Sequence, residues 1–190
     1  MRFDEFISEQ HIDVLPVDRL PGFAVGVELP PEWEPIDSPN GLRVWVWASD
    51  PHRNFFCANA VLNFYRLEAV LDPASVFAML CEQQQGSVPN CSEIVRDFAA
   101  ATEGPGVAAT VVLQIDHEVG TIDSATRSRI VVAERETLIA QLTVTALHDS
   151  TRDHAQFALS MVVDQAADST AGGHSSGAPV NAPQGRRHEQ

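Results

Sequence analysis

The segment 29–36, LPPEWEPI, is followed by the alternating run 42–47, LRVWVW, and by the apolar run 55–67, FFCANAVLNFYRL. The alternation of 42–47 predicts a β-strand with large side chains on both faces. In 55–67 both alternating registers are largely apolar, which predicts a central strand covered on two sides. Asp72 and Pro73 then supply an N-cap and a first helical residue, so a helix is expected to begin there.

The second half of the chain predicts more strands and one more helix. Three strands are expected at 107–117, 125–134 and 138–147, and the last of them alternates cleanly between apolar and polar residues. Residues 150–166 begin with a capping-box-like pattern and carry an alanine-rich apolar stripe, which predicts a second helix that closes the fold.

These elements place the chain in the α+β class. Antiparallel hairpins with separated helices are typical of that class, and apolar residues on both faces of the middle strands predict an antiparallel β-sheet flanked by helices on both faces. We expect a single domain over residues 1–167. Residues 168–190 are mostly small and polar, and such a segment cannot offset the entropy of ordering, so a disordered tail is predicted.

The net charge of the chain limits the classes of molecule that it could bind. Its 190 residues carry a formal net charge of −14, and residues 1–50 hold ten acidic residues against three arginines. An acidic surface repels nucleic-acid phosphates and anionic lipid heads, so we expect no nucleic-acid partner. No apolar run is long enough for a membrane span. A protein partner, including a basic one, remains compatible with this charge.

The start of the sequence and the cysteines bear on location. The first ten residues are acidic and lack the apolar core of a signal peptide, and the first cysteine, Cys57, lies inside a predicted strand. With no signal peptide or lipid-accepting cysteine, a cytoplasmic location is expected. Cys57, Cys81 and Cys91 suit free thiols, with a Cys81–Cys91 bridge as the alternative.

Residues 26–166 resemble the LpqN/LpqT-type lipoprotein family of mycobacteria. The resemblance rests on LPPEWEP at 29–35, NAVLNFYRL at 59–67, the helix that Asp72 and Pro73 open, and the strand 138–147. It implies a Mog1/PsbP-like fold, in which an antiparallel sheet lies between helices in an α/β/α sandwich. It also implies a binding or accessory role without established catalysis, and a location at the cell envelope if the start of the sequence is misassigned.

No stretch of the sequence predicts a reaction centre. Residues 173–177 match G-x-S-x-G but lie in the predicted tail, without the strand and helix that a nucleophile elbow needs. Residues 104–109 match G-x-G-x-x-A, but a β-branched strand follows, so a hairpin turn is expected. Residues 116–118 and the pair His148 and His154 lack the spacing of a zinc site. We therefore expect no catalytic residue, no cofactor and no metal.

The aromatic residues are the candidates for binding. Trp45 and Trp47 share one face of their strand, where they pack under the nearest helix in one interpretation. In the other, the tryptophans, including Trp33, line a groove with Phe55 or Tyr65 for a partner or an apolar ligand. Asn59 and Asn63 share the register of Tyr65, and if they are buried each amide needs hydrogen-bond partners from the backbone or from a ligand.

Together these patterns predict a non-enzymatic binding protein that acts through protein–protein interaction. The acidic N-terminal third and the tryptophan-bearing strand are its expected surfaces, and the partner is unidentified. The alternative is a small carrier that holds a lipid or other apolar ligand between sheet and helix. A third hypothesis, an enzyme of unrecognised chemistry, lacks a motif to support it.

Overall fold

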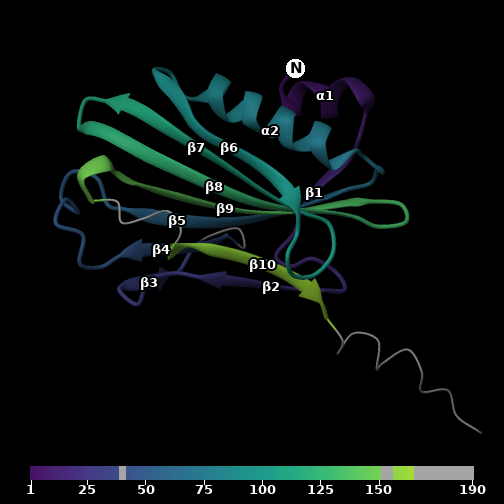
Figure 1. Cartoon of the computed structure of the whole chain (residues 1–190), viewed down its shortest axis with the longest axis horizontal. Coiled ribbons are helices and arrows are strands. Elements are labelled where there is room, and N and C mark those ends of the chain that lie inside the picture. Colours follow the sequence, from purple (N-terminus) through teal and green to yellow (C-terminus); the bar gives the residue numbers. More distant parts are fainter. Residues whose placement is uncertain (39–41, 151–155, 165–190) are drawn as a thin grey trace, which may run out of the picture.

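An eight-stranded antiparallel sheet forms the middle layer of the computed structural model, which describes residues 1–38, 42–150 and 156–164. The strand order is β3-β4-β5-β9-β8-β7-β6, and β1 pairs with the end of β5 beyond β4 (Figure 1). The strands are β1 (Val14–Pro16), β3 (Trp33–Ile36), β4 (Arg43–Trp47), β5 (Asn59–Leu67), β6 (Cys91–Ala100), β7 (Val107–His117), β8 (Gly120–Val132) and β9 (Thr137–Leu147).

Two helices cover one face of this sheet. Helix α1 (Phe3–Gln10) and helix α2 (Pro73–Ser87) lie on the same side, as Figure 1 shows. Asp72 caps α2 by accepting the backbone N–H of Ser75 at 2.9 Å, and the hydrogen bonds from Ser75 lower the pKa of this carboxyl. Beneath the helices lies an apolar core that includes Phe77, Leu80 and Ile139. The helix predicted at Asp72 and Pro73 is confirmed.

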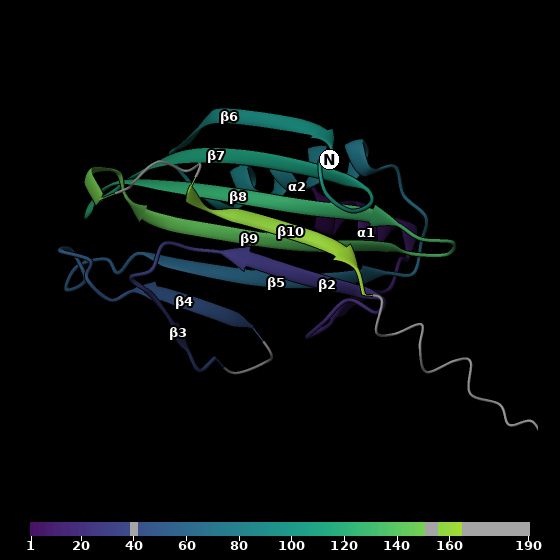
Figure 2. The same cartoon turned by 60° about the horizontal axis from the view of Figure 1, so that its bottom comes forward.

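The opposite face is covered by a two-stranded ribbon of β2 (Phe23–Glu28) and β10 (Ala158–Val163). Figure 2 shows this ribbon in front of the main sheet. The α+β class and the antiparallel sheet are confirmed, but the prediction of helices on both faces is wrong, because both helices lie on one face. The closing helix predicted at 150–166 is also wrong, because 158–163 is a strand; residues 151–155 and 165–166 lie outside the described residues.

The strand forms at β10 because its larger apolar side chains repeat every second residue. Phe157, Leu159 and Met161 all pack into the second apolar core, between the ribbon and the sheet. The predicted helical stripe relied on alanines, which bury little surface. The antiparallel partner that stabilises β10, with Met161 opposite Val25, lies far away in the sequence.

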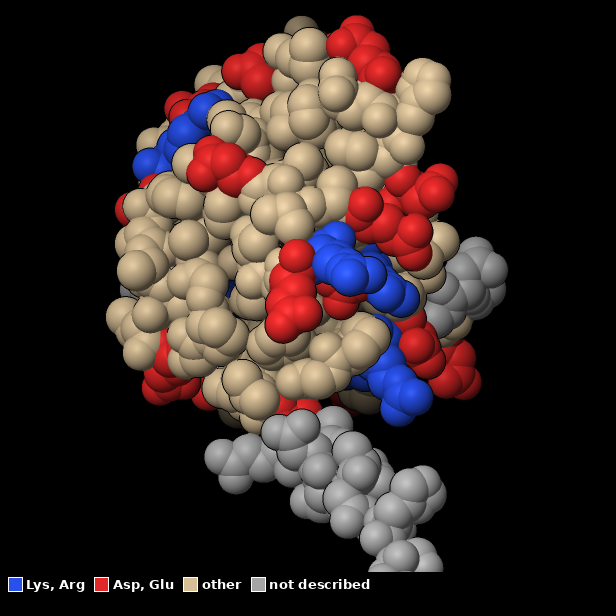
Figure 3. All heavy atoms as spheres, turned by 90° about the vertical axis from the view of Figure 1, so that its right-hand side faces the viewer, with Lys and Arg blue, Asp and Glu red and all other residues tan. Residues whose placement is uncertain are grey.

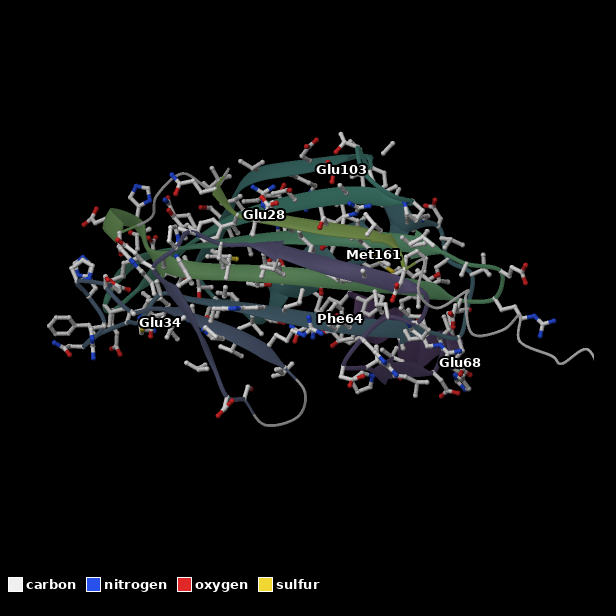
Figure 4. The ribbon with its side chains drawn as sticks, turned by 90° about the horizontal axis from the view of Figure 1, so that it is seen from below. Glu28, Glu34, Phe64, Glu68, Glu103 and Met161 are labelled. Carbon is white, nitrogen blue, oxygen red and sulfur yellow. The ribbon has the colours of Figure 1, made fainter. Side chains whose placement is uncertain are left out.

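Arg129 of β8 attaches β10 to the main sheet. Its side chain is only 4% exposed, and its Nη2 donates to the carbonyl oxygens of Glu103 at 2.8 Å, Pro105 at 3.0 Å and Met161 at 3.4 Å. Glu103 and Met161, labelled in Figure 4, come from the turn between β6 and β7 and from β10. Gly104 is required in this turn, because a Cβ there would meet the Met161 oxygen at 2.1 Å and its φ is +70°. The turn predicted at 104–106 is confirmed.

The strand predicted at 55–67 begins four residues later than expected, at Asn59. The reason is Asp50, which is 2% exposed and accepts the backbone N–H groups of His52 and Ala58, both at 2.8 Å. These hydrogen bonds hold residues 51–58 in a loop, outside the strand. The predicted tail, 168–190, lies outside the described residues.

Arg129→Ala should lower the free energy of unfolding by about 2–4 kcal/mol, because it leaves several buried carbonyl groups without their charged donor. Urea denaturation measures this change. Arg135→Ala, at an exposed position between β8 and β9, is the matched control and should leave the unfolding midpoint unchanged. Equal stability of the two variants would contradict the role of Arg129.

Candidate functional site

A cavity of about 650 Å³ lies between α1, α2 and the main sheet. Its wall of apolar side chains comes from both helices and from the chain that joins α1 to β1, and comprises Phe3, Ile7, Ile12, Val14 and Leu80. Its floor is formed by β5 and β9, with Asn63, Tyr65, Gln141 and Thr143. The same elements also contribute polar side chains to the lining, namely Asp4, Ser8, His11, Asp13, Gln83 and Gln84. The cavity therefore has a wall of apolar and polar side chains above a polar, uncharged floor.

The polar floor arises from two rows of paired residues across β5, β9 and β8. In one row Asn63 lies opposite Gln141, whose Nε2 donates to Ser128 Oγ at 3.2 Å. In the next row Thr143 and Thr126 are hydrogen-bonded through their hydroxyl oxygens at 3.0 Å. All these groups are neutral. Buried polar side chains cost stability unless they are paired, so this floor is satisfied internally except where it meets the cavity.

Asn63 and Tyr65 are the floor residues available to a ligand. Neither side chain forms a hydrogen bond within the described part of the chain, and both lie on the helix-facing side of β5. Burial raises the pKa of the Tyr65 phenol, which keeps the hydroxyl protonated as a donor. Asn59 lies four residues before Asn63 on the same strand. Its side-chain Nδ2 donates to the backbone oxygen of Cys57 at 3.1 Å.

Three consecutive glutamines fix the helix that roofs the cavity. Gln83 Oε1 accepts the backbone N–H of Asp4 at 2.8 Å, which joins α2 to α1. Gln84 Nε2 donates to Thr126 Oγ1 at 3.1 Å, which joins α2 to the floor, and Gln85 Nε2 donates to Glu93 Oε2 of β6 at 2.6 Å. Sequence reasoning missed these residues. A run of three amides directly after an apolar helical stripe was the available signal.

The aromatic residues predicted as a binding surface are divided between the two faces of the sheet. Trp33 and Trp45 pack half-buried against the ribbon-side core, and the Trp33 ring meets the Phe157 ring edge-on at 5.4 Å between centroids. Trp47, opposite Trp33 on the neighbouring strand, donates from Nε1 to Glu32 Oε2 at 2.8 Å. The tryptophans therefore pack toward the ribbon rather than under a helix. Tyr65 alone faces the cavity.

Across the described ranges, no group of three or more His, Cys, Asp or Glu side chains is arranged to hold a metal ion. His148 Nδ1 lies 2.8 Å from Oδ2 of the buried Asp123, beside a separate cavity of about 180 Å³. Ligand pockets usually exceed roughly 300 Å³, so this space suits no substrate of ordinary size. His154 lies outside the described residues.

The three cysteines are free thiols, so the Cys81–Cys91 bridge is not formed. Burial raises the pKa of the Cys81 thiol to about 11, which leaves it protonated and unreactive at neutral pH.

A model of the Lpp-LpqN family, described as probable lipoprotein LpqN, matches residues 1–167. The chain belongs to this family. A crystal structure of LpqN, described as involved in cell envelope biogenesis of Mycobacterium tuberculosis, is similar with a TM-score of 0.64 and 20% identity, over 78% of this chain and 87% of that chain. At this identity the likeness shows the fold alone. Among curated proteins no match was found.

Family membership confirms the resemblance seen in the sequence and corrects the expected location. The cytoplasmic location is wrong, because the family is described as a lipoprotein family, and lipoproteins belong to the cell envelope. The expectation was drawn from the acidic first residues and from the position of the first cysteine, Cys57, inside a predicted strand. Within the residues that the structure describes, no helix is both long and apolar enough to cross a lipid bilayer. The family description names a lipoprotein and no reaction.

His148 should titrate above its ordinary pKa, because the hydrogen bond and the charge of Asp123 favour the imidazolium. Since the pKa is raised in the folded state, the stabilisation by this pair is fully present below the unfolded pKa and is lost as the pH rises through the folded pKa. An NMR titration of the His148 ring measures the shift. Asp123→Asn should move the pKa back down, and a His148 pKa at its ordinary value in the unmodified protein would contradict the pairing.

Proposed function

We propose that this protein is a non-enzymatic binding protein of the cell envelope that holds an amphiphilic ligand in the cavity between α1, α2 and the sheet. The observation that carries the proposal is the pairing of apolar wall side chains with an uncharged polar floor in one cavity of about 650 Å³. Ligand pockets of this kind are typically ~300–1,000 Å³ and mostly apolar, with a few polar groups that orient the ligand. The description of LpqN as a protein of envelope biogenesis is consistent with a ligand of this class.

The lining also indicates the charge of the ligand. The floor offers amides and hydroxyls such as Asn63, Gln141 and Thr143, so an anionic head group would lose its hydration there without gaining a counter-ion. The exposed carboxylates of Asp4 and Asp13 line the same cavity, and the chain carries a net charge of −14, which disfavours an anionic ligand. The ligand that fits has an aliphatic part and a hydrogen-bonding end that carries no negative charge.

Arginines do not offset this acidity with a basic surface on the face that Figure 3 shows. On that face the basic side chains lie beside acidic ones. Arg66 pairs with Glu136 in the same way, between β5 and the turn that precedes β9. An anionic head group that approaches these arginines therefore also meets acidic side chains.

Ile7→Glu should weaken the binding of 1-monolauroylglycerol at least about tenfold, because it sets a carboxylate against the aliphatic part of the ligand. Isothermal titration calorimetry measures the affinity. Gln10→Glu adds the same charge to the exposed side of the same helix and should bind as the unmodified protein does.

Laurate, which has the same chain and a charged head, should bind more weakly than 1-monolauroylglycerol to the unmodified protein. Asn63→Leu supplies a second variant in case Ile7→Glu unfolds, and the loss of one hydrogen bond of about 1 kcal/mol should weaken binding roughly fivefold. Absence of any binding by the folded, unmodified protein would overturn the proposed function.

A second candidate function is recognition of a protein partner at the tryptophan-bearing edge, formed by β3 and β4. Strand β3 is an edge strand of the main sheet, and its residue Ile36 is 46% exposed. On the neighbouring strand β4, Trp47 is half-buried. Edge strands with exposed apolar side chains are common sites of pairing with another chain. Acidic Glu32 and Glu34 on this edge favour a basic partner.

A photo-crosslinking residue at position 47 should form one discrete protein adduct in native cells, read by mass spectrometry. The same residue at exposed Leu15 in β1 should form none. Trp47→Ala should retain the melting temperature, whereas Trp45→Ala should lower it because Trp45 packs into the core. No adduct at position 47, or unfolding by Trp47→Ala, would contradict this candidate.

A further inference from the structure

A second cavity, of about 460 Å³, lies at a break in the pairing along one edge of β5. On this edge β4 pairs with β5 only as far as Leu62, and β1 begins to pair at Tyr65. Figure 4 shows Phe64, which lies between these two points, on β5 between β4 and the N-terminal segment. Among the residues that the structure describes, no strand pairs with this short part of the β5 edge, and only the backbone N–H of Val17, just after β1, donates to the Phe64 oxygen there, at 3.4 Å.

The second cavity is more apolar than the first. Leu62 and Phe64 in its wall are 1% and 4% exposed, and Val17 and Leu42 complete the apolar lining. Leu42 itself is 41% exposed, so it marks the open side of the cavity. The apolar part of this lining suits the end of an aliphatic chain, while Asp18, Asn63 and Tyr65 contribute its polar groups.

The two cavities share their boundary. Asn63 and Tyr65 line both of them, and Tyr65 is the larger of the two side chains. The Tyr65 ring also packs half-buried against the helix-side core, which holds it in place. A chain that enters from the helix side therefore meets this ring before it reaches the space beyond.

We propose that Tyr65 determines the length of the aliphatic chain that the protein accepts, and that the cavity beside Leu42 is the extension of the ligand site that Tyr65 closes off. The inference rests on the proposed function, since it concerns the ligand of the same site. Each methylene that stays buried strengthens binding about fourfold. That gain ends in the unmodified protein when the chain reaches the Tyr65 ring.

A series of 1-monoacylglycerols of increasing chain length, measured by calorimetry, tests this inference. In the unmodified protein the affinity should rise about fourfold per methylene and then level off. In Tyr65→Ala the rise should continue through several further methylenes. Tyr65→Phe retains the ring and should level off where the unmodified protein does.

A large side chain that fills the second cavity separates the contribution of that cavity from the contribution of the space left when the Tyr65 ring is removed. Leu42→Trp, combined with Tyr65→Ala, should restore the original limit, because the indole fills the extension at an already exposed position. Leu15→Trp in the same background is the matched control: its side chain is exposed on β1 and lines neither cavity, so the longer limit should remain. If Tyr65→Ala unfolds, Tyr65→Val replaces it.

The outcomes separate the two proposals. Binding with the same limit in the unmodified protein and in Tyr65→Ala, or a longer limit that Leu42→Trp does not remove, overturns the role of Tyr65 and leaves the ligand site in place. Absence of binding for every chain length in every folded variant overturns the ligand site itself.

Discussion

The pairing of β5 with β9 is the constraint on which the rest of the structure depends. In the described main sheet, every other pair joins strands from the same half of the chain, and this pair alone joins the two halves, from Asn59 opposite Thr145 to Leu67 opposite Thr137. Side chains alternate between faces along a strand, so a slip of one residue would exchange all of them. The register therefore fixes that Leu62 and Phe64 face the ribbon while Asn63 and Tyr65 face the helices.

This register gives the sheet two different faces. The ribbon side is apolar and closely covered, with Leu62 and Leu142 fully buried in its core. The helix side is apolar under α2 but carries amides and hydroxyls farther along β5 and β9. A stable core gains nothing from such groups, because each must be paired when it is buried. Their presence beside a cavity is therefore a reason to assign binding to the helix side.

The sequence allowed prediction of those elements whose signals are local. The alternation of β9 was sufficient to predict a strand, and the Asp72 cap was sufficient to predict the start of α2, because each signal depends only on neighbouring residues. The apolar registers of β5 likewise predicted a strand with two covered faces, but not that a ribbon covers one of them. Strand β6 is an edge strand that is exposed at nearly every position, so it carries no apolar alternation from which a strand could be predicted. Strand β10 was missed because its partner, β2, is distant in the sequence.

The candidate site was harder to predict than the fold. Tyr65 was selected as an aromatic residue that could bind a ligand, and it does face a cavity, but the tryptophans chosen with it pack on the other side of the sheet. Alternation groups Trp45 with Trp47 without indicating which layer covers them. Gln83 and Gln84 attach α2 to α1 and to the sheet beside the cavity, and these contacts join residues far apart in the chain. The binding of a protein partner stays a prediction.

The ribbon of β2 and β10 has a further consequence for how the molecule folds. One strand lies near the beginning of the described chain and the other at its end, so the apolar side of the sheet cannot be covered until almost all residues through Val163 are available. Topologies dominated by contacts of large sequence separation fold slowly and leave apolar surface exposed in the meantime. This half of the molecule is therefore where transient association between nascent chains is expected.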